Sequence, residues 1–136
     1  MSESRSHIDL VATVVNYVKK LVLPDFHAII QYDSPDSPRP SKVIGNFIPD
    51  VYFWNKDLLI IGEAKTLKDF DKRHSLDQYR AYMQECKNFW GESILVIAVP
   101  WPLVITAKNH FRRLKKEFVT DVSIFVLNEL GEVFKV

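Results

Sequence analysis

One stretch constrains the fold of this chain more than any other. Residues 94–99 are six apolar side chains in a row, and Pro100 and Pro102 follow directly. An uninterrupted apolar run of this length is typical of a central strand that is buried on both faces of its sheet. Proline has no amide hydrogen to donate, so the strand is expected to end at residue 99.

The rest of the chain alternates amphipathic and apolar segments around this strand. Apolar residues recur at helical spacing in three segments, which predicts helices over 6–23, over 75–89 and from a cap at Thr106 through Phe118. Short apolar segments predict further strands over 26–32, 43–54, 58–64 and 122–127, and a short edge strand over 133–136. Prolines predict a loop over 33–42. We therefore expect an α/β fold with a mixed sheet of four to five strands, flanked by helices on both faces.

Length and composition narrow the class of protein. The 136 residues suit one domain, and 47% apolar with 26% charged residues is the balance of a soluble globular protein. No apolar stretch approaches the roughly 20 residues of a membrane span, so we expect no membrane partner. Cys86 is the single cysteine, which excludes an internal disulfide and fits a cytoplasmic or other intracellular reducing compartment.

Charge excludes one mode of nucleic-acid binding and leaves another open. The net charge of +1 excludes a polybasic, histone-like mode of nucleic-acid binding. A local basic patch is still compatible with it, and Lys108, Arg112, Lys115 and Lys116 form a stripe on the last predicted helix. Two interpretations of this stripe stay open: a solvent-exposed polar face, or a surface that contacts DNA phosphates.

Two carboxylates and a lysine are predicted to meet at one edge of the sheet. Asp50 is expected near the middle of the strand over 43–54, and Glu63 and Lys65 at the end of the next strand. Residues two apart on a strand point to the same face, and the hairpin brings Asp50 alongside Glu63. Carboxylate oxygens without a neighbouring cysteine or histidine cluster suit a hard divalent cation, Mg²⁺ or Mn²⁺.

The pattern Pro49-Asp50, a spacer and then Glu63-Ala64-Lys65 resembles the signature of the PD-(D/E)xK phosphodiesterases, the restriction-endonuclease-like nucleases. The resemblance implies a restriction-endonuclease-like core of order αβββαβ, here followed by a C-terminal αβ unit, in a single nuclease domain over 1–136. It also implies that Asp50, Glu63 and the backbone carbonyl of Ala64 are ligands of Mg²⁺ or Mn²⁺, and that Lys65 is the catalytic lysine.

A second motif lies on the helix after this lysine. Gln78 and Tyr82 are four residues apart and share a helix face. Gln-x-x-x-Tyr is similar to the extra motif of the RecB-like and lambda-exonuclease-like branch, in which both side chains approach the active site. Alternatives stay open: Ser75 and Gln78 also match a capping box, and Tyr82 also suits the edge of the core.

The resemblance allows one further ligand, because some branches add an acidic residue or a histidine from the first helix. Glu3, His7 and Asp9 are the candidates in this sequence.

These observations predict a metal-dependent DNA nuclease, directed to a structure or an end and without long sequence specificity. An alternative is an endonuclease resembling Holliday-junction resolvases, which act as homodimers. Another is a non-cleaving nucleic-acid-binding module on the same fold. The sequence does not separate RNA from DNA as the substrate.

Overall fold

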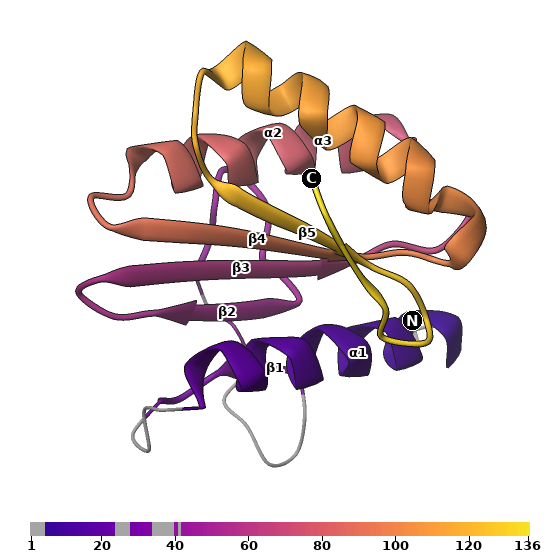
Figure 1. Cartoon of the computed structure of the whole chain (residues 1–136), viewed down its shortest axis with the longest axis horizontal. Coiled ribbons are helices and arrows are strands. Elements are labelled where there is room, and N and C mark those ends of the chain that lie inside the picture. Colours follow the sequence, from indigo (N-terminus) through magenta and orange to yellow (C-terminus); the bar gives the residue numbers. More distant parts are fainter. Residues whose placement is uncertain (1–4, 24–27, 34–39, 41) are drawn as a thin grey trace.

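The computed structural model describes residues 5–23, 28–33, 40 and 42–136. Helices and strands alternate along most of this chain (Figure 1). The helices are α1 (Arg5–Val22), α2 (Arg73–Asn88), the short 3₁₀ helix η1 (Trp101–Leu103) and α3 (Val104–Phe118). The strands are β1 (Gln31–Tyr32), β2 (Val51–Trp54), β3 (Leu58–Ala64), β4 (Glu92–Ala98), β5 (Ser123–Leu127) and β6 (Val133–Lys135).

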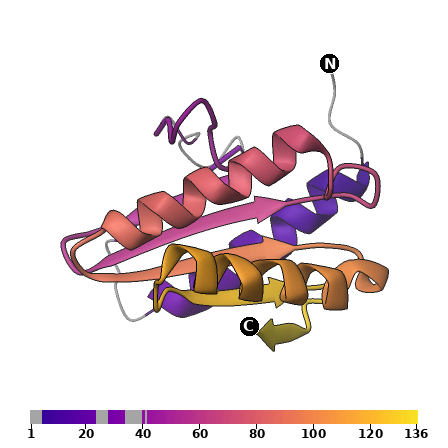
Figure 2. The ribbon, with the colours of Figure 1, turned by 90° about the horizontal axis from the view of Figure 1, so that it is seen from above.

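The strands form one open mixed sheet in the order β1-β2-β3-β4-β5-β6. The central pairs β3·β4 and β4·β5 are parallel, and the outer pairs are antiparallel. Helix α1 covers one face, while α2 and α3 lie side by side over the other (Figures 1 and 2). The α/β class, the mixed sheet and the helices on both faces are confirmed. The sheet has six strands, one more than the upper end of the expected four to five, because short strands pair at both edges.

Each face of the sheet has its own apolar core. Leu59 and Ile61 of β3 pack under α2 and α3, whereas Ile60 packs under α1. Gly62 allows α1 to approach closely, because a Cβ at this position would lie 2.5 Å from Val14 Cγ1. None of the described helices is both long enough and apolar enough to cross a membrane.

The predicted strand over 43–54 is wrong in its first half, since β2 begins only at Val51. Ile44 and Phe47 exchange backbone hydrogen bonds of 2.8 and 3.0 Å across a tight turn, and Gly45 in that turn has a φ of +62°. A left-handed backbone of this kind is accessible to glycine and ends any extended run. The chain therefore turns back on itself before β2.

Other boundaries also differ from the expectation. Helix α3 begins at Val104, directly after η1, so Thr106 lies inside the helix and does not cap it. Strand β1 contains only Gln31 and Tyr32 of the predicted segment 26–32, in which residues 26 and 27 lie outside the described residues. Most of the predicted loop over 33–42 lies outside them too.

Candidate active site

Asp50 and Glu63 lie next to each other at one edge of the sheet. Val51 of β2 pairs with Gly62 of β3, so the residue before β2 faces the residue after Gly62. The Asp50 amide lies 3.4 Å from Glu63 Oε1, to which it donates, and the Ala64 amide donates to Asp50 Oδ2 at 3.0 Å. Asp50 immediately precedes β2 and is not in the middle of a strand, but the predicted neighbourhood with Glu63 is confirmed.

Lys65 lies on the same side of the sheet as Glu63. Its amide donates to the Ala98 carbonyl at 3.0 Å, which continues the ladder between β3 and β4 beyond the end of β3. Its ammonium Nζ lies 3.9 Å from Glu63 Oε2. Both residues are buried, so this pair has little of the solvent screening that weakens surface ion pairs.

Helix α2 closes these side chains into a ring of polar contacts. Lys65 Nζ donates to Gln78 Oε1. Gln78 Nε2 donates to the Tyr82 hydroxyl at 2.9 Å, and that hydroxyl donates to Glu63 Oε1 at 2.8 Å. Lysine can only donate, so it fixes the orientation of the Gln78 amide. The structure thus brings together Glu63, Lys65, Gln78 and Tyr82, as predicted.

The capping box predicted as an alternative for Gln78 is not formed. Helix α2 begins at Arg73, its N-cap is Lys72, and no side chain caps this end. Gln78 therefore lies well inside the helix, and its side chain is engaged with Lys65 and Tyr82. Tyr82 is fully buried in the core, so its two interpretations combine: it packs in the core and contacts the site.

One more side chain reaches this site, from the opposite face of the sheet. His7, near the start of α1, places Nε2 3.2 Å from Asp50 Oδ2. Ligand atoms of His7, Asp50 and Glu63 all lie within 4.8 Å of one another. His7 is thereby selected from the three candidates in this segment.

Asp9, one of the other two candidates, lies away from the site. Asp9 is exposed and lies 3.7 Å from Arg5, one turn away on the outer face of α1, and Glu3 lies outside the described residues. A sequence signal for His7 exists in retrospect. His7, Leu10 and Val14 follow each other at spacings of three and four, so His7 extends the inward stripe of α1 by one turn.

The two carboxyl groups have opposite electrostatic environments. Complete burial and the neighbouring Asp50 raise the pKa of Glu63 well above its usual range, against the opposing effects of Lys65 and Tyr82. Burial alone would raise the pKa of Asp50 too, but hydrogen bonds from His7, Glu63 and the Ala64 amide outweigh it and lower that pKa. Two carboxyl groups this close repel each other when both are ionised, and a cation bound between them would relieve that repulsion.

The donor set fits a divalent cation. Two carboxylates supply oxygen atoms, which Mg²⁺ and Mn²⁺ prefer, and the imidazole nitrogen of His7 favours Mn²⁺ over Mg²⁺. The peptide of Ala64 lies beside Asp50, as its amide contact shows.

Comparison of the chain with protein-family models, curated proteins and solved structures found no match. The geometry of Asp50, Glu63, Lys65, Gln78 and Tyr82, together with His7, is therefore the basis for assigning a function.

Proposed function

We propose that this protein is a metal-dependent phosphodiesterase of the PD-(D/E)xK type that hydrolyses nucleic acid, with DNA as its first expected substrate. The observation that carries the proposal is the ring in which Lys65 and Glu63 lie 3.9 Å apart, with Asp50 hydrogen-bonded beside them. Convergence of charged groups in one small buried site is typical of catalysis.

In this proposal Asp50, Glu63 and His7 hold Mg²⁺ or Mn²⁺, and the carbonyl of Ala64 adds a backbone ligand. Such an ion neutralises charge on a phosphodiester and lowers the pKa of a bound water. Two carboxyl groups this close would favour a bound cation, because its positive charge would offset the repulsion between Asp50 and Glu63 that raises the pKa of Glu63.

The remaining side chains act on the reacting phosphate through position and charge. The Lys65 ammonium stabilises the negative charge that builds on the phosphorus oxygens and orients the attacking water. Gln78 holds this ammonium in place by accepting its hydrogen bond. Tyr82 orients Glu63 by donating to Oε1, which leaves Oε2 on the side of Lys65.

A cleavage panel tests the proposal: single strand, blunt duplex, flap, four-way junction and closed circle, as DNA and RNA, each with Mg²⁺, Mn²⁺ or EDTA. Wild-type protein is expected to cleave at least one DNA substrate in the presence of a cation and none in EDTA. Asp50→Asn is expected to abolish cleavage and to weaken Mn²⁺ binding in calorimetry. Lys65→Met is expected to abolish cleavage and to retain Mn²⁺ binding.

Asp57→Asn is the matched control, because Asp57 is an exposed aspartate at the opposite end of the β2–β3 hairpin. It is expected to behave as wild type. Cleavage that persists unchanged in Asp50→Asn, or Mn²⁺ affinity that is the same in both aspartate variants, would refute the proposal.

A further inference from the structure

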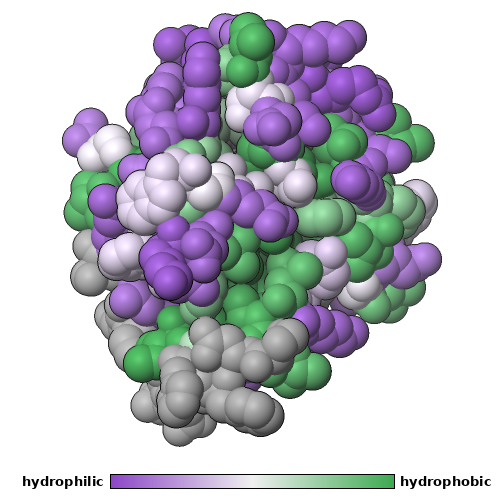
Figure 3. Space-filling view, turned by 60° about the vertical axis from the view of Figure 1, so that its left-hand side comes forward, coloured by the Kyte–Doolittle hydropathy of each residue, from purple (hydrophilic) through white to green (hydrophobic). Residues whose placement is uncertain are grey.

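A groove with aromatic walls lies at the end of the molecule away from the carboxylates. Its volume is about 420 Å³, and it opens between β2, the C-terminal end of α2 and the segment before β2. The lining includes Tyr52, Trp54, Phe89 and Trp90, with Lys42 and Glu85 as charged groups. Figure 3 views this end of the molecule and shows apolar side chains exposed below a hydrophilic upper part.

Trp54 and Trp90, the two tryptophans of the groove, are both largely exposed in the described part of the chain. Trp54 is 55% exposed and Trp90 is 73% exposed. Exposed aromatic side chains that cluster in one groove are typical of a binding surface, whereas single exposed apolar side chains are common and carry no such meaning.

Two of the aromatic rings that line the groove, those of Phe89 and Trp90, are held in place by contacts within the protein. The rings of Phe89 and Trp90 are stacked, with centroids 4.4 Å apart and an interplanar angle of 27°. The indole nitrogen of Trp90 donates to the backbone carbonyl of Lys56 in the β2–β3 turn. A rigid flat surface of this kind binds planar rings at a low entropic cost.

The charged groups of the groove, Lys42 and Glu85, are compatible with a nucleotide. The Glu85 carboxylate accepts hydrogen bonds and so suits the amino or imino groups of a base, as in contacts with cytosine. Lys42 offers an ammonium to a phosphate. Aromatic walls, one acceptor and one cation are the components of a subsite for single-stranded nucleic acid.

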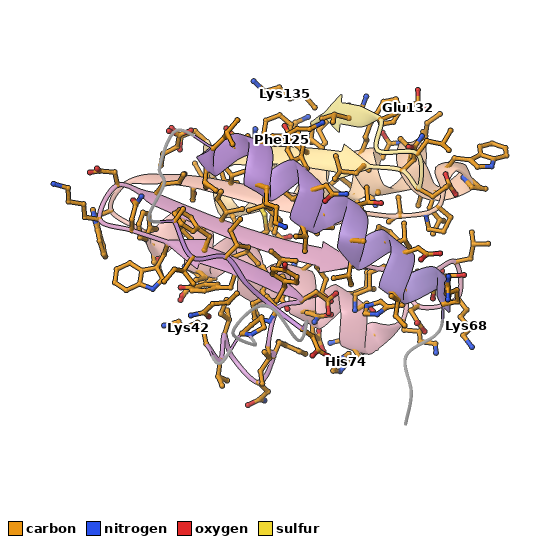
Figure 4. The ribbon with its side chains drawn as sticks, turned by 90° about the horizontal axis from the view of Figure 1, so that it is seen from below. Lys42, Lys68, His74, Phe125, Glu132 and Lys135 are labelled. Carbon is orange, nitrogen blue, oxygen red and sulfur yellow. The ribbon has the colours of Figure 1, made fainter. Side chains whose placement is uncertain are left out.

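The groove and the candidate active site lie along the same face of β3. Leu59 lines the groove and Glu63 belongs to the site; they are four residues apart and point to the same side, so about 13 Å separates them. Tyr82 of α2 contacts the site, and Phe89, the C-cap of the same helix about two turns further on, lines the groove. Figure 4 shows Lys42, His74 and Lys68 in succession along one flank, from the groove toward the end that carries the site.

We infer that this groove is a base-stacking subsite, in which Trp54 and Trp90 hold a nucleobase of single-stranded nucleic acid a few nucleotides from the bond that is cleaved. The inference rests on the proposed function and adds to it the substrate class: a strand with at least one unpaired segment. Duplex DNA has no free base face to offer, so a fully paired substrate gains nothing from the groove.

The test measures binding of an oligothymidylate in EDTA, by fluorescence anisotropy of a label and by quenching of tryptophan emission. Trp54→Leu and Trp90→Leu each remove a stacking surface from an exposed position, so the fold is expected to persist. Stacking of a base on an aromatic ring contributes enough that each change is expected to weaken the Kd about 5- to 150-fold. Binding of blunt duplex is expected to change little.

Trp101→Leu is the matched control, because Trp101 is the third tryptophan of the chain and is 69% exposed in η1, outside the groove. It is expected to keep the affinity and the quenching of wild type. A double Trp54→Leu, Trp90→Leu variant is expected to lose the quenching, although Trp101 still emits.

Each other outcome overturns the inference. Equal affinity of wild type and the double variant for the oligothymidylate would refute the subsite. Weakened self-association of that variant without a change in DNA binding would refute it too, because the groove would then be a contact between copies of the chain. Thymidine monophosphate that binds as tightly as the strand would identify a nucleotide pocket unrelated to strand cleavage. The proposed function fails separately, when wild-type protein binds the strand through its tryptophans and cleaves nothing with Mg²⁺ or Mn²⁺.

Discussion

The substitution Tyr82→Phe removes a single oxygen atom from the centre of the polar ring and leaves the aromatic packing in place. The lost hydroxyl accepts from Gln78 at 2.9 Å and donates to Glu63 at 2.8 Å, and all three side chains are buried. Leaving buried partners without a hydrogen bond costs about 1–3 kcal/mol. For a domain of this size each kcal/mol lowers the Tm by about 4 °C, so the Tm is expected to fall by about 4–12 °C.

The same change is expected to affect catalysis, because Glu63 loses the donor that orients it. If about 1.4 kcal/mol of this loss appears in the transition state, kcat falls about tenfold. Tyr79→Phe separates this effect from general destabilisation. Tyr79 is also fully buried on α2, but its hydroxyl donates to the backbone carbonyl of Phe70 at 2.8 Å, outside the polar ring.

The assay combines thermal unfolding with cleavage kinetics at a temperature where both variants are folded. Both tyrosine variants are expected to lose stability to a similar extent, and only Tyr82→Phe is expected to lose kcat. Equal specific activity of the two variants would refute the role assigned to Tyr82. A Tm of Tyr82→Phe equal to that of wild type would refute the hydrogen-bonded ring itself.

Three further predictions concern other parts of the molecule. Burial and nearby arginines lower the pKa of His110 below its usual 6.5, so below that pH the unfolded chain binds a proton more readily than the folded chain does. The free energy of unfolding is therefore expected to decrease as the pH falls through this range. In denaturant titrations at several pH values, His110→Leu is expected to reduce this pH dependence. Burial raises the pKa of the Cys86 thiol to about 12, so iodoacetamide is expected to alkylate it only after unfolding, as read by mass spectrometry. If α3 contacts DNA phosphates, replacing Lys115 and Lys116 by glutamine is expected to reduce the slope of log K against log salt concentration by about one to two. The same double replacement at Lys19 and Lys20, in the last turn of α1, is the control. Equal slopes in the two double variants would show that the basic stripe of α3 is a solvent-exposed face.

The central strands could be predicted closely because their signals are local. Strand β3 matches the predicted segment, since a turn precedes its apolar run and the charged residues Glu63 and Lys65 occur at its end. The prediction of a strand before β2 is wrong because the apolar side chains of this segment resemble a strand pattern. Gly45 turns the chain there, and Ile44 is buried by contacts with other elements that the pattern does not contain.

The candidate site was predictable only where its residues are close in sequence or on paired strands. Asp50 and Glu63 follow from the hairpin, and Lys65 from the alternation of a strand. Gln78 had a competing local pattern with Ser75, and its contact with Lys65 decided between the two. His7 lies 43 residues from Asp50, so their contact depends on how α1 packs across the sheet.

The site draws on both faces of the sheet, and this ties its assembly to the folding of the whole domain. The position of His7 depends on the core under α1, whereas the positions of Gln78 and Tyr82 depend on the core under α2. A partly folded chain that has formed only one of these cores contains only part of the set. Such a chain, newly synthesised or locally unfolded, has Asp50 and Glu63 without their full surroundings and is expected to be inert toward nucleic acid. Loss of activity on denaturation should therefore coincide with the first loss of either core and precede complete unfolding.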